Sequence, residues 1–268
     1  MNPFNYHKPS SLAAAVALHR DAEDPAYLSG GHTLLPTMTQ RLAAPSDLID
    51  LEGLTELTGI AAQGSVLSIG AFTRHAEVAA SSEVRGALPA LADLAEGVGD
   101  AQVRNRGTMG GSLANSDPAA DYPAAALALN AVIRTDRREI AADDYFRGLF
   151  ETALAEDEVI TRIDFAVPSR AAYEKFPNPA SRYATVGVMV ADFGGAVRVG
   201  ITGAGPCACR APAFEAALSA RLAPASLDDA ELPAIDFNSD LHASAEYRAH
   251  LVRVMAQRAT ARIAAGTD

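Results

Sequence analysis

The stretch "YLSGGHTLLP", residues 27–36, places a glycine pair, Gly30-Gly31, directly after a short apolar segment. A small hydroxyl residue, Thr33, follows two positions after the pair. Glycine reaches positive φ and lets a ligand approach the backbone closely. Successive amide N–H groups in such a turn can face one concavity and bind an anion. Taken alone, the stretch is more typical of an ordinary tight turn than of a binding site, because glycine pairs are common in turns.

A second glycine pair of the same kind lies 80 residues further along the chain. Gly110-Gly111 is followed by the hydroxyl residue Ser112, within "GDAQVRNRGTMGGSLANSDPAAD" at residues 99–121. The Gly, Asn and Asp content of this segment predicts one long loop, and long loops inside compact domains are usually functional. Two such glycine loops together could hold the two phosphates of one dinucleotide.

The end of this segment carries two aspartates, four residues apart. Asp117 precedes Pro118, a pair that predicts a helix N-cap with proline at the first helical position. The spacing would then place Asp121 one turn further on, on the same face of the helix.

The composition is that of a globular protein. Of 268 residues, 49% are hydrophobic and 21% are charged, which is not typical of a disordered chain. The formal net charge of −11 argues against nucleic acid as a partner, because a surface that binds nucleic acid is basic.

The cysteines and the N-terminal sequence concern the cellular compartment. Cys207 and Cys209 lie one residue apart, which would strain a disulfide, and two thiols are too few for a metal site or an iron–sulfur cluster. The chain opens without a signal-peptide pattern, and no apolar run approaches the ~20 residues that span a bilayer. We expect a cytoplasmic protein without an integral membrane segment.

Hydrophobic periodicity predicts a mixture of helices and strands without internal repeats. The predicted helices lie at 10–21, 33–43, 73–98 (in two pieces), 122–130, 211–222 and 244–266. The predicted strands lie at 26–31, 47–51, 65–73, 131–135, 158–168, 181–191 and 195–205. The last two strands are expected to pair through a turn near 192–195.

No other motif supplies a catalytic or metal-binding set. Residues 203–208, "GAGPCA", fit the dinucleotide pattern G-x-G-x-x-A after a strand, but the turn contains Pro206 and no βαβ continuation follows. A turn at a strand end is therefore expected there. The sequence lacks hydrolase and P-loop motifs, and its six histidines are scattered. We predict no catalytic acid or base and no metal ligands.

The two glycine motifs at this separation, "SGGHTLLP" and "RNRGTMGGSLANSDPAADYPAAALAL", resemble those of the FAD-binding subunit of molybdenum hydroxylases. The likeness is to the medium chain of aerobic carbon monoxide dehydrogenase and its relatives, and more distantly to the FAD subunit of xanthine dehydrogenase. It continues through "YEKFPNPASRYATVGV" and the "GAGP" turn, and so covers most of the chain.

The resemblance implies an α+β fold. It consists of a PCMH-type (vanillyl-alcohol-oxidase-type) FAD-binding domain made of two α/β subdomains, followed by a smaller C-terminal α+β domain. On this basis we expect an N-terminal FAD-binding subdomain at 1–55 and a second at 56–167. A C-terminal domain of the carbon monoxide dehydrogenase flavoprotein type is expected at 168–268.

The resemblance also implies which residues bind the cofactor. The two glycine loops would hold the FAD diphosphate, Asp121 would make a polar contact, Ile160 would lie beside the flavin, and Lys175 would contact it. The implied cofactor-binding residues are Ser29, Gly30, Gly31, His32, Thr33, Thr108, Met109, Gly110, Gly111, Ser112, Asp121, Ile160 and Lys175. His32 is expected to lie against a non-covalently bound FAD.

The implied function is electron transfer within a multi-subunit oxidoreductase. The FAD would take electrons from the [2Fe–2S] clusters of a small partner subunit and pass them to an external acceptor. The molybdopterin cofactor would belong to a large partner subunit, and the assembly would be a dimer of heterotrimers. Two alternatives stay open, a self-sufficient FAD-dependent oxidoreductase and a non-redox assembly subunit. The substrate and the final acceptor (quinone, NAD or oxygen) are not specified by the sequence.

Overall fold

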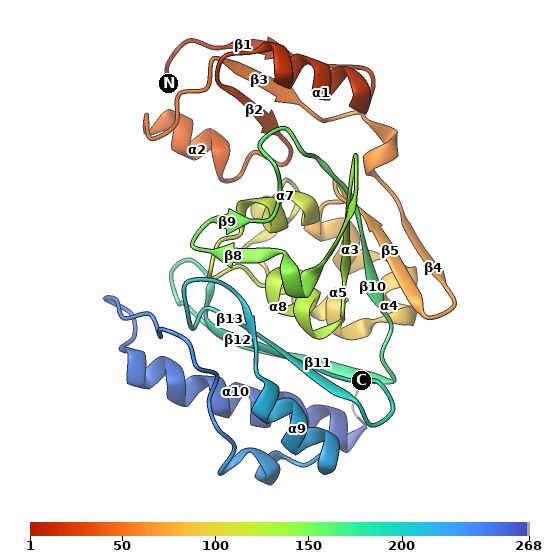
Figure 1. Ribbon diagram of the computed structural model, residues 1–268, viewed down its shortest axis with the longest axis vertical. Helices are drawn as coiled ribbons and strands as arrows, with labels where there is room; N and C mark the ends of the chain where they lie inside the picture. The colour runs from red at the N-terminus through yellow and green to blue at the C-terminus, as the bar shows by residue number, and fades with distance from the viewer. Residues whose placement is uncertain (267–268) are drawn as a thin grey trace.

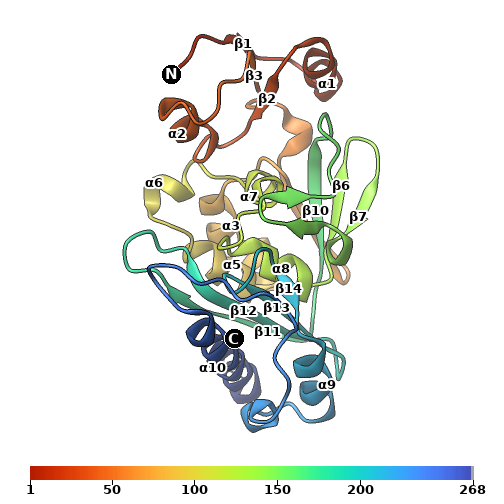
Figure 2. The ribbon, with the colours of Figure 1, turned by 60° about the vertical axis from the view of Figure 1, so that its left-hand side comes forward.

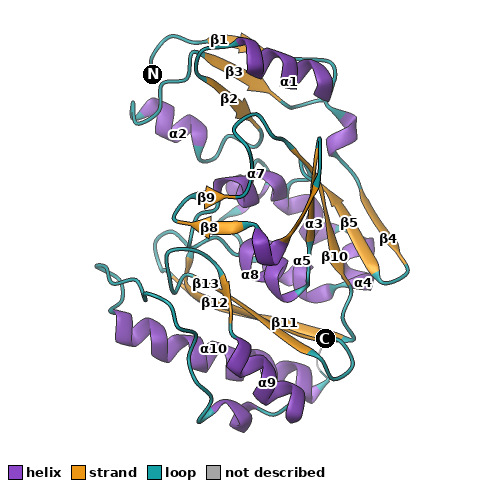
Figure 3. Ribbon diagram, viewed as in Figure 1, coloured by secondary structure: helices purple, strands orange, loops and turns teal. Residues whose placement is uncertain are grey.

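The computed structural model describes residues 1–266 and stacks three units along its long axis, each built around one sheet (Figure 1). The N-terminal unit lies at the top of this view and the C-terminal unit at the bottom. Helices and strands are mixed in all three units, which confirms the predicted α+β class (Figure 3).

The N-terminal unit is a small parallel sheet of order β1-β3-β2 with two helices. Its elements are β1 (Asn5–His7), α1 (Leu12–Asp21), β2 (Pro25–Leu28), α2 (Leu34–Thr39) and β3 (Asp47–Asp50). Ser11 caps α1, because its side chain accepts a hydrogen bond from the amide of Ala14. The glycine pair Gly30-Gly31 follows β2 and precedes α2, so it lies at the carboxyl end of a parallel strand.

The middle unit is an antiparallel sheet of order β4-β5-β10-β6-β7, with a run of helices inserted between β5 and β6. Its strands are β4 (Ile60–Gln63), β5 (Val66–Gly70), β6 (Val132–Thr135), β7 (Glu139–Ala141) and β10 (Ile160–Ala166), with a separate hairpin of β8 (Phe146–Gly148) and β9 (Glu151–Thr152). Its helices are α3 (His75–Ala80), α4 (Ser82–Ala87), α5 (Pro89–Glu96), α6 (Ala101–Arg104), α7 (Met109–Asn115) and α8 (Tyr122–Ala128), with short 3-10 turns η1 (Thr55–Leu57) and η2 (Ala142–Asp144).

The C-terminal unit is an antiparallel sheet of order β11-β12-β13-β14, covered on both faces (Figure 2). Its elements are β11 (Arg170–Pro177), β12 (Ala184–Asp192), β13 (Val197–Thr202), β14 (Cys209–Arg210), α9 (Pro212–Ala220), η3 (Pro224–Leu227) and α10 (Ala245–Ala265). Helices α9 and α10 cover one face, while α5 and α8 of the middle unit cover the other. All nine residues of β12 are buried, as a nearly continuous apolar run predicts for a strand covered on both faces.

Close packing joins the middle and C-terminal units. A Cβ at Gly200 in β13 would lie 2.1 Å from the carbonyl oxygen of Ala124 in α8, so only glycine lets this helix approach the sheet. The paired strands β12 and β13 and the turn between them confirm the predicted hairpin, and 203–208 is a turn after β13 as expected. None of the helices within residues 1–266 is long and apolar enough to cross a membrane.

Three local predictions were wrong. The segment 99–121 is not one long loop, because α6 and α7 form inside it, each capped by a side chain (Asp100 and Thr108) that the composition hides. The region 73–98 forms three helices instead of two. Asp117 does not start a helix; its carboxylate accepts a hydrogen bond from the Ala119 amide in a tight turn, and α8 begins only after Asp121.

Candidate functional site

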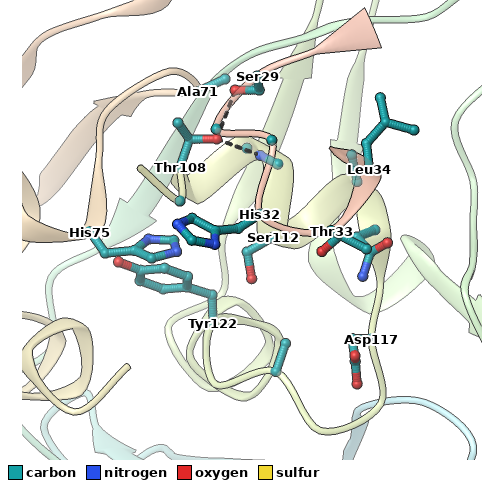
Figure 4. Close-up of a pocket in the computed structure, with 18 of the residues that line it drawn as sticks. Ser29, His32, Thr33, Leu34, Ala71, His75, Thr108, Ser112, Asp117 and Tyr122 are labelled. Atoms are coloured by element: carbon teal, nitrogen blue, oxygen red, sulfur yellow. Dashed lines mark hydrogen bonds between the residues drawn. The ribbon is translucent and has the colours of Figure 1, made fainter. Parts of the chain in front are cut away.

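A cavity of about 640 Å³ lies where the N-terminal and middle units meet, and a loop of the C-terminal unit also lines it (Figure 4). Most of the predicted cofactor-binding residues line this cavity, although they come from distant parts of the chain. They are Ser29, Gly30, Gly31, His32, Thr33, Thr108, Gly110, Gly111, Ser112, Asp121 and Ile160. The structure therefore brings the two glycine loops to one place, as the dinucleotide hypothesis requires.

The first glycine loop, residues 29–33, offers unused hydrogen-bond donors. Gly31 has a φ of 75°, a left-handed conformation that favours glycine. Within the described part of the chain, no group accepts a hydrogen bond from the amides of Gly31, His32 or Thr33. Thr33 precedes α2 but makes no side-chain cap. These amides line the cavity and are available to an anionic ligand.

The second glycine loop, residues 108–112, uses its amides within the protein. The amides of residues 109–112 donate to Thr73, Ala71 and Thr108, the last through both its carbonyl and its hydroxyl oxygen. The Thr108 hydroxyl thereby caps α7. This loop therefore contributes a fixed surface to the cavity. It also contributes the Ser112 hydroxyl, which Figure 4 shows beside the first loop.

The glycines of the two loops are needed partly for protein packing. A Cβ at Gly110 would lie 2.6 Å from the Cβ and 2.8 Å from the carbonyl oxygen of Ala71. A Cβ at Gly30 would lie 2.2 Å from the carbonyl oxygen of Arg106. At both positions the space beside the glycine belongs to neighbouring backbone, so glycine is needed there for packing within the protein.

Hydrogen bonds hold the two loops together across the boundary between the units. The Ser29 and Thr108 hydroxyl oxygens are 2.8 Å apart. The His32 Nε2 lies 3.2 Å from the carbonyl oxygen of Gln102, to which it can donate. His32 is exposed and lines the cavity, so the two loops together form one side of the cavity, which includes a histidine.

Two buried polar groups in the cavity wall, His75 and Tyr122, were not predicted from the sequence. Their ring centroids are 5.2 Å apart, and neither His75 Nδ1 nor the Tyr122 hydroxyl has a partner among the described residues (Figure 4). Burial, with smaller contributions from the nearby His32 and Arg104, lowers the pKa of His75 to about 4, so the ring is neutral at pH 7. Unpartnered buried polar groups in a cavity wall are typical of a binding site.

Asp121 also lines the cavity, and it is buried. The Tyr173 hydroxyl donates to its carboxylate at 2.5 Å, and Lys175 Nζ lies 3.0 Å from it. Burial raises the pKa of Asp121, and Lys175 opposes that shift. Lys175 itself does not line the cavity, and neither does Met109, which is fully buried in the core.

The loop between β11 and β12 contributes residues that the sequence analysis did not identify. Arg182, with a φ of 63°, and Tyr183 both line the cavity. Tyr183 is 45% exposed, and burial together with the nearby carboxylates of Asp117 and Asp121 raises its pKa. The stretch "YEKFPNPASRYATVGV" could have indicated them, but only Lys175 was taken from it.

The wall between β2 and β10 is apolar. Ile160 lies there with Leu57, Phe72 and Leu154. The cavity thus combines free amides with apolar and polar wall residues, which suits a ligand that carries both a charged group and flat rings. Its volume lies within the usual range of cofactor pockets. Within residues 1–266, no cluster of three or more His, Cys, Asp or Glu side chains could hold a metal ion.

Two protein families match the chain. Residues 2–169 match the family described as FAD binding domain in molybdopterin dehydrogenase, and residues 171–263 match the CO dehydrogenase flavoprotein C-terminal domain. Between them, the two matches cover nearly all of the described residues.

Similar proteins cover the whole chain. The carbon monoxide dehydrogenase medium chain of Hydrogenophaga pseudoflava is 36% identical over 96% of this chain and 95% of its own. The nicotine 6-hydroxylase medium subunit of Paenarthrobacter nicotinovorans is 36% identical over 94% of each. Reconstituted CO dehydrogenase from Oligotropha carboxidovorans contains a solved chain with a TM-score of 0.90 and 34% identity, over 98% of both chains.

Proposed function

The chain belongs to the family of FAD-binding subunits of molybdopterin dehydrogenases, and we propose that it is the electron-transfer subunit of such a complex. Its relatives are FAD subunits of dehydrogenases and hydroxylases, so the class is oxidoreductase. The observation that carries the proposal is the cavity between two units, where the two glycine loops meet around free amides.

In this proposal the protein binds and orients the cofactor. The amides of Gly31, His32 and Thr33 would hold the diphosphate, with the Ser112 hydroxyl as a further donor. Ile160 would lie beside one ring system, and Asp121 would accept a hydrogen bond at the other end. We also keep the division into domains 1–55, 56–167 and 168–268 as part of the proposal.

When bound, FAD supplies the redox chemistry, receiving electrons from a partner subunit and delivering them to an external acceptor. The proposed partners are a small subunit with [2Fe–2S] clusters and a large subunit with molybdopterin, arranged as a dimer of heterotrimers. The family membership and the medium chains of multi-subunit relatives support these partners. We place the complex in the cytoplasm.

We further propose that the FAD is not covalently bound. His32 Nε2 lies against the carbonyl oxygen of Gln102, which leaves that nitrogen engaged within the protein. Acid precipitation of the flavin-loaded chain should release all of the FAD into the supernatant. Flavin that stays with the precipitated protein would contradict this part of the proposal.

The experiment that tests the proposed function is purification of the chain with its partners from the native host. We expect a flavin absorbance spectrum, two further subunits, and both iron and molybdenum in the preparation. A chain that is isolated alone and oxidises a substrate without partners would support the self-sufficient oxidoreductase instead. A chain that takes up no FAD, alone or in the complex, would support the non-redox assembly subunit.

A further inference from the structure

Two side chains of β11 in the C-terminal unit, Tyr173 and Lys175, reach Asp121 in the cavity wall without lining the cavity themselves. They are two residues apart on one strand, so they lie on the same face of the sheet. Both contact the Asp121 carboxylate, which directly precedes α8 in the middle unit. Asp121 makes no cap bond to its own helix, so its carboxylate faces the strand instead.

The ammonium group of Lys175 is fully committed within the protein. Its Nζ lies 2.9 Å from the carbonyl oxygen of Gly97, 3.1 Å from that of Arg182 and 3.0 Å from the Asp121 carboxylate. A lysine has three N–H donors, and each has an acceptor here. Only 11% of the side chain is exposed. A direct contact between Lys175 and a ligand would require one of these bonds to break.

The strand next to β11 is built around this arrangement. Gly187 of β12 pairs with Lys175, and a Cβ at Gly187 would lie only 2.2 Å from the Tyr173 hydroxyl oxygen. The glycine therefore makes the space in which the Tyr173 hydroxyl reaches Asp121. The 2.5 Å bond between them leaves the Asp121 carboxylate with little freedom to rotate.

We propose that Lys175 is a positioning residue that acts on the cofactor through Asp121 and through the 178–183 loop. Its ammonium holds the buried Asp121 carboxylate as an oriented acceptor at the cavity wall, where a cofactor N–H or O–H group can donate to it. Through the carbonyl of Arg182 it also fixes the loop that carries Arg182 and Tyr183 to the cavity. This inference rests on the proposed FAD-binding function.

The positive charge of Lys175 also affects the protonation of the Asp121 carboxylate. A buried carboxylate without a counter-charge takes up a proton more readily, because burial disfavours the charged form. Without Lys175, the pKa of Asp121 should rise further, so that the carboxylate takes up a proton more readily and loses its role as a charged acceptor. The only other lysine in the sequence, Lys8, pairs with Glu52 at 3.2 Å on the surface of the N-terminal unit and provides a matched control.

The test is FAD titration of the full apo-chain, followed by flavin fluorescence, for K175M, D121N, the double variant and K8M. We expect K175M to weaken FAD binding about 30-fold at pH 7 and D121N to weaken it comparably. The FAD affinity of the double variant should be no lower than that of the single variant with the lower affinity, because both changes remove the same interaction. K8M should bind as the wild type does. FAD binding by K175M should recover as the pH rises from 6 to 9, while that by the wild type changes little.

Losses that multiply in the double variant, or a K175M loss that does not depend on pH, would overturn the inference and indicate direct contact with FAD. If K175M unfolds, thermal unfolding of the apo-chains decides instead. The double variant should then have a higher Tm than K175M, because it no longer buries a carboxyl group that must either stay charged without a counter-charge or take up a proton. An equal or lower Tm would overturn the inference. A wild-type chain that takes up no FAD, with this Tm relation intact, would count against the proposed function alone.

Discussion

The two glycine loops look alike in sequence but have different physical roles. Each has two glycines followed by a small hydroxyl residue, and both line one cavity. In the loop at 29–33 the amides of residues 31–33 have no acceptor among the described residues, whereas the amides of residues 109–112 all donate within the protein. The first loop can therefore bind an anion through its backbone, and the second serves as the rigid platform against which the first is held.

The difference shows that a glycine pair does not by itself specify a phosphate site. Gly31 has a positive φ, so glycine is favoured there for its backbone conformation. Gly110 is helical and faces Ala71, so glycine is required there for close packing. Substitutions at the two positions should separate these two effects, one on cofactor affinity and the other on the stability of the chain.

The largest expected effect is that of Gly110→Val. The new side chain would meet the Ala71 backbone, which cannot move without distorting the segment between β5 and α3. We expect the free energy of unfolding of the apo-chain to fall by about 3 kcal/mol, measured by denaturant unfolding without FAD. Gly86→Ala, at a helical glycine with open space around it, should leave stability unchanged or raise it. An apo-chain as stable as the wild type would refute the packing role of Gly110.

A comparable effect concerns His75, whose Nε2 packs against Gly107 just before the second loop. The pKa of His75 is about 4 in the folded chain, below its ordinary value of 6.5, because the ring is buried. As the pH falls, the unfolded chain therefore protonates His75 before the folded chain does. The contribution of the neutral His75 ring to the free energy of unfolding is fully present above pH 6.5. About 3 kcal/mol of it is lost as the pH falls toward 4.

Comparison with His75→Leu over this pH range isolates the contribution, because other groups titrate in both proteins. The stability difference between wild type and variant should shrink by that amount from pH 6.5 to pH 4. A difference that stays constant over the range would show that His75 is not held neutral.

A smaller effect is expected for Gly31→Ala in the first loop. Alanine in the left-handed region costs about 1 kcal/mol of stability, but shifts of the loop amides should also weaken FAD binding about 10-fold, which is about 1.4 kcal/mol. Gly194→Ala is the matched control, with a φ of 80° in the β12–β13 turn and only Ser169 Oγ near its Cβ position. It should lose similar stability and keep full FAD affinity. Equal affinity losses in both variants would mean that the first loop has no special role.

The smallest effect concerns the bond between the loops. Ser29→Ala removes the 2.8 Å contact with the Thr108 hydroxyl but leaves that hydroxyl capping α7. We expect about 1 kcal/mol of lost stability. Thr108→Val should cost about twice as much, because it removes the cap as well. Thermal unfolding of both apo-chains would measure this order, and a reversed order would show that the cap contributes little.

The sequence predicted seven of the fourteen strands within residues 1–266 and the long helices, because their apolar residues follow the period of the element. It did not predict α6 and α7, where capping by Asp100 and Thr108 outweighs a loop-like composition. Most of the residues that the resemblance selected line the cavity. Neither the state of the amides nor the His75–Tyr122 pair could be predicted, since both depend on which distant backbone each group meets.

The most direct test of the difference between the loops is amide hydrogen exchange, resolved by residue, with and without FAD. We expect the amides of Gly31, His32 and Thr33 to exchange rapidly in the apo-chain and to become protected when FAD binds. The amides of residues 109–112 should already be protected without FAD and change little. Protection gained at 109–112, with residues 31–33 still exchanging rapidly, would contradict the assignment of the diphosphate to the first loop.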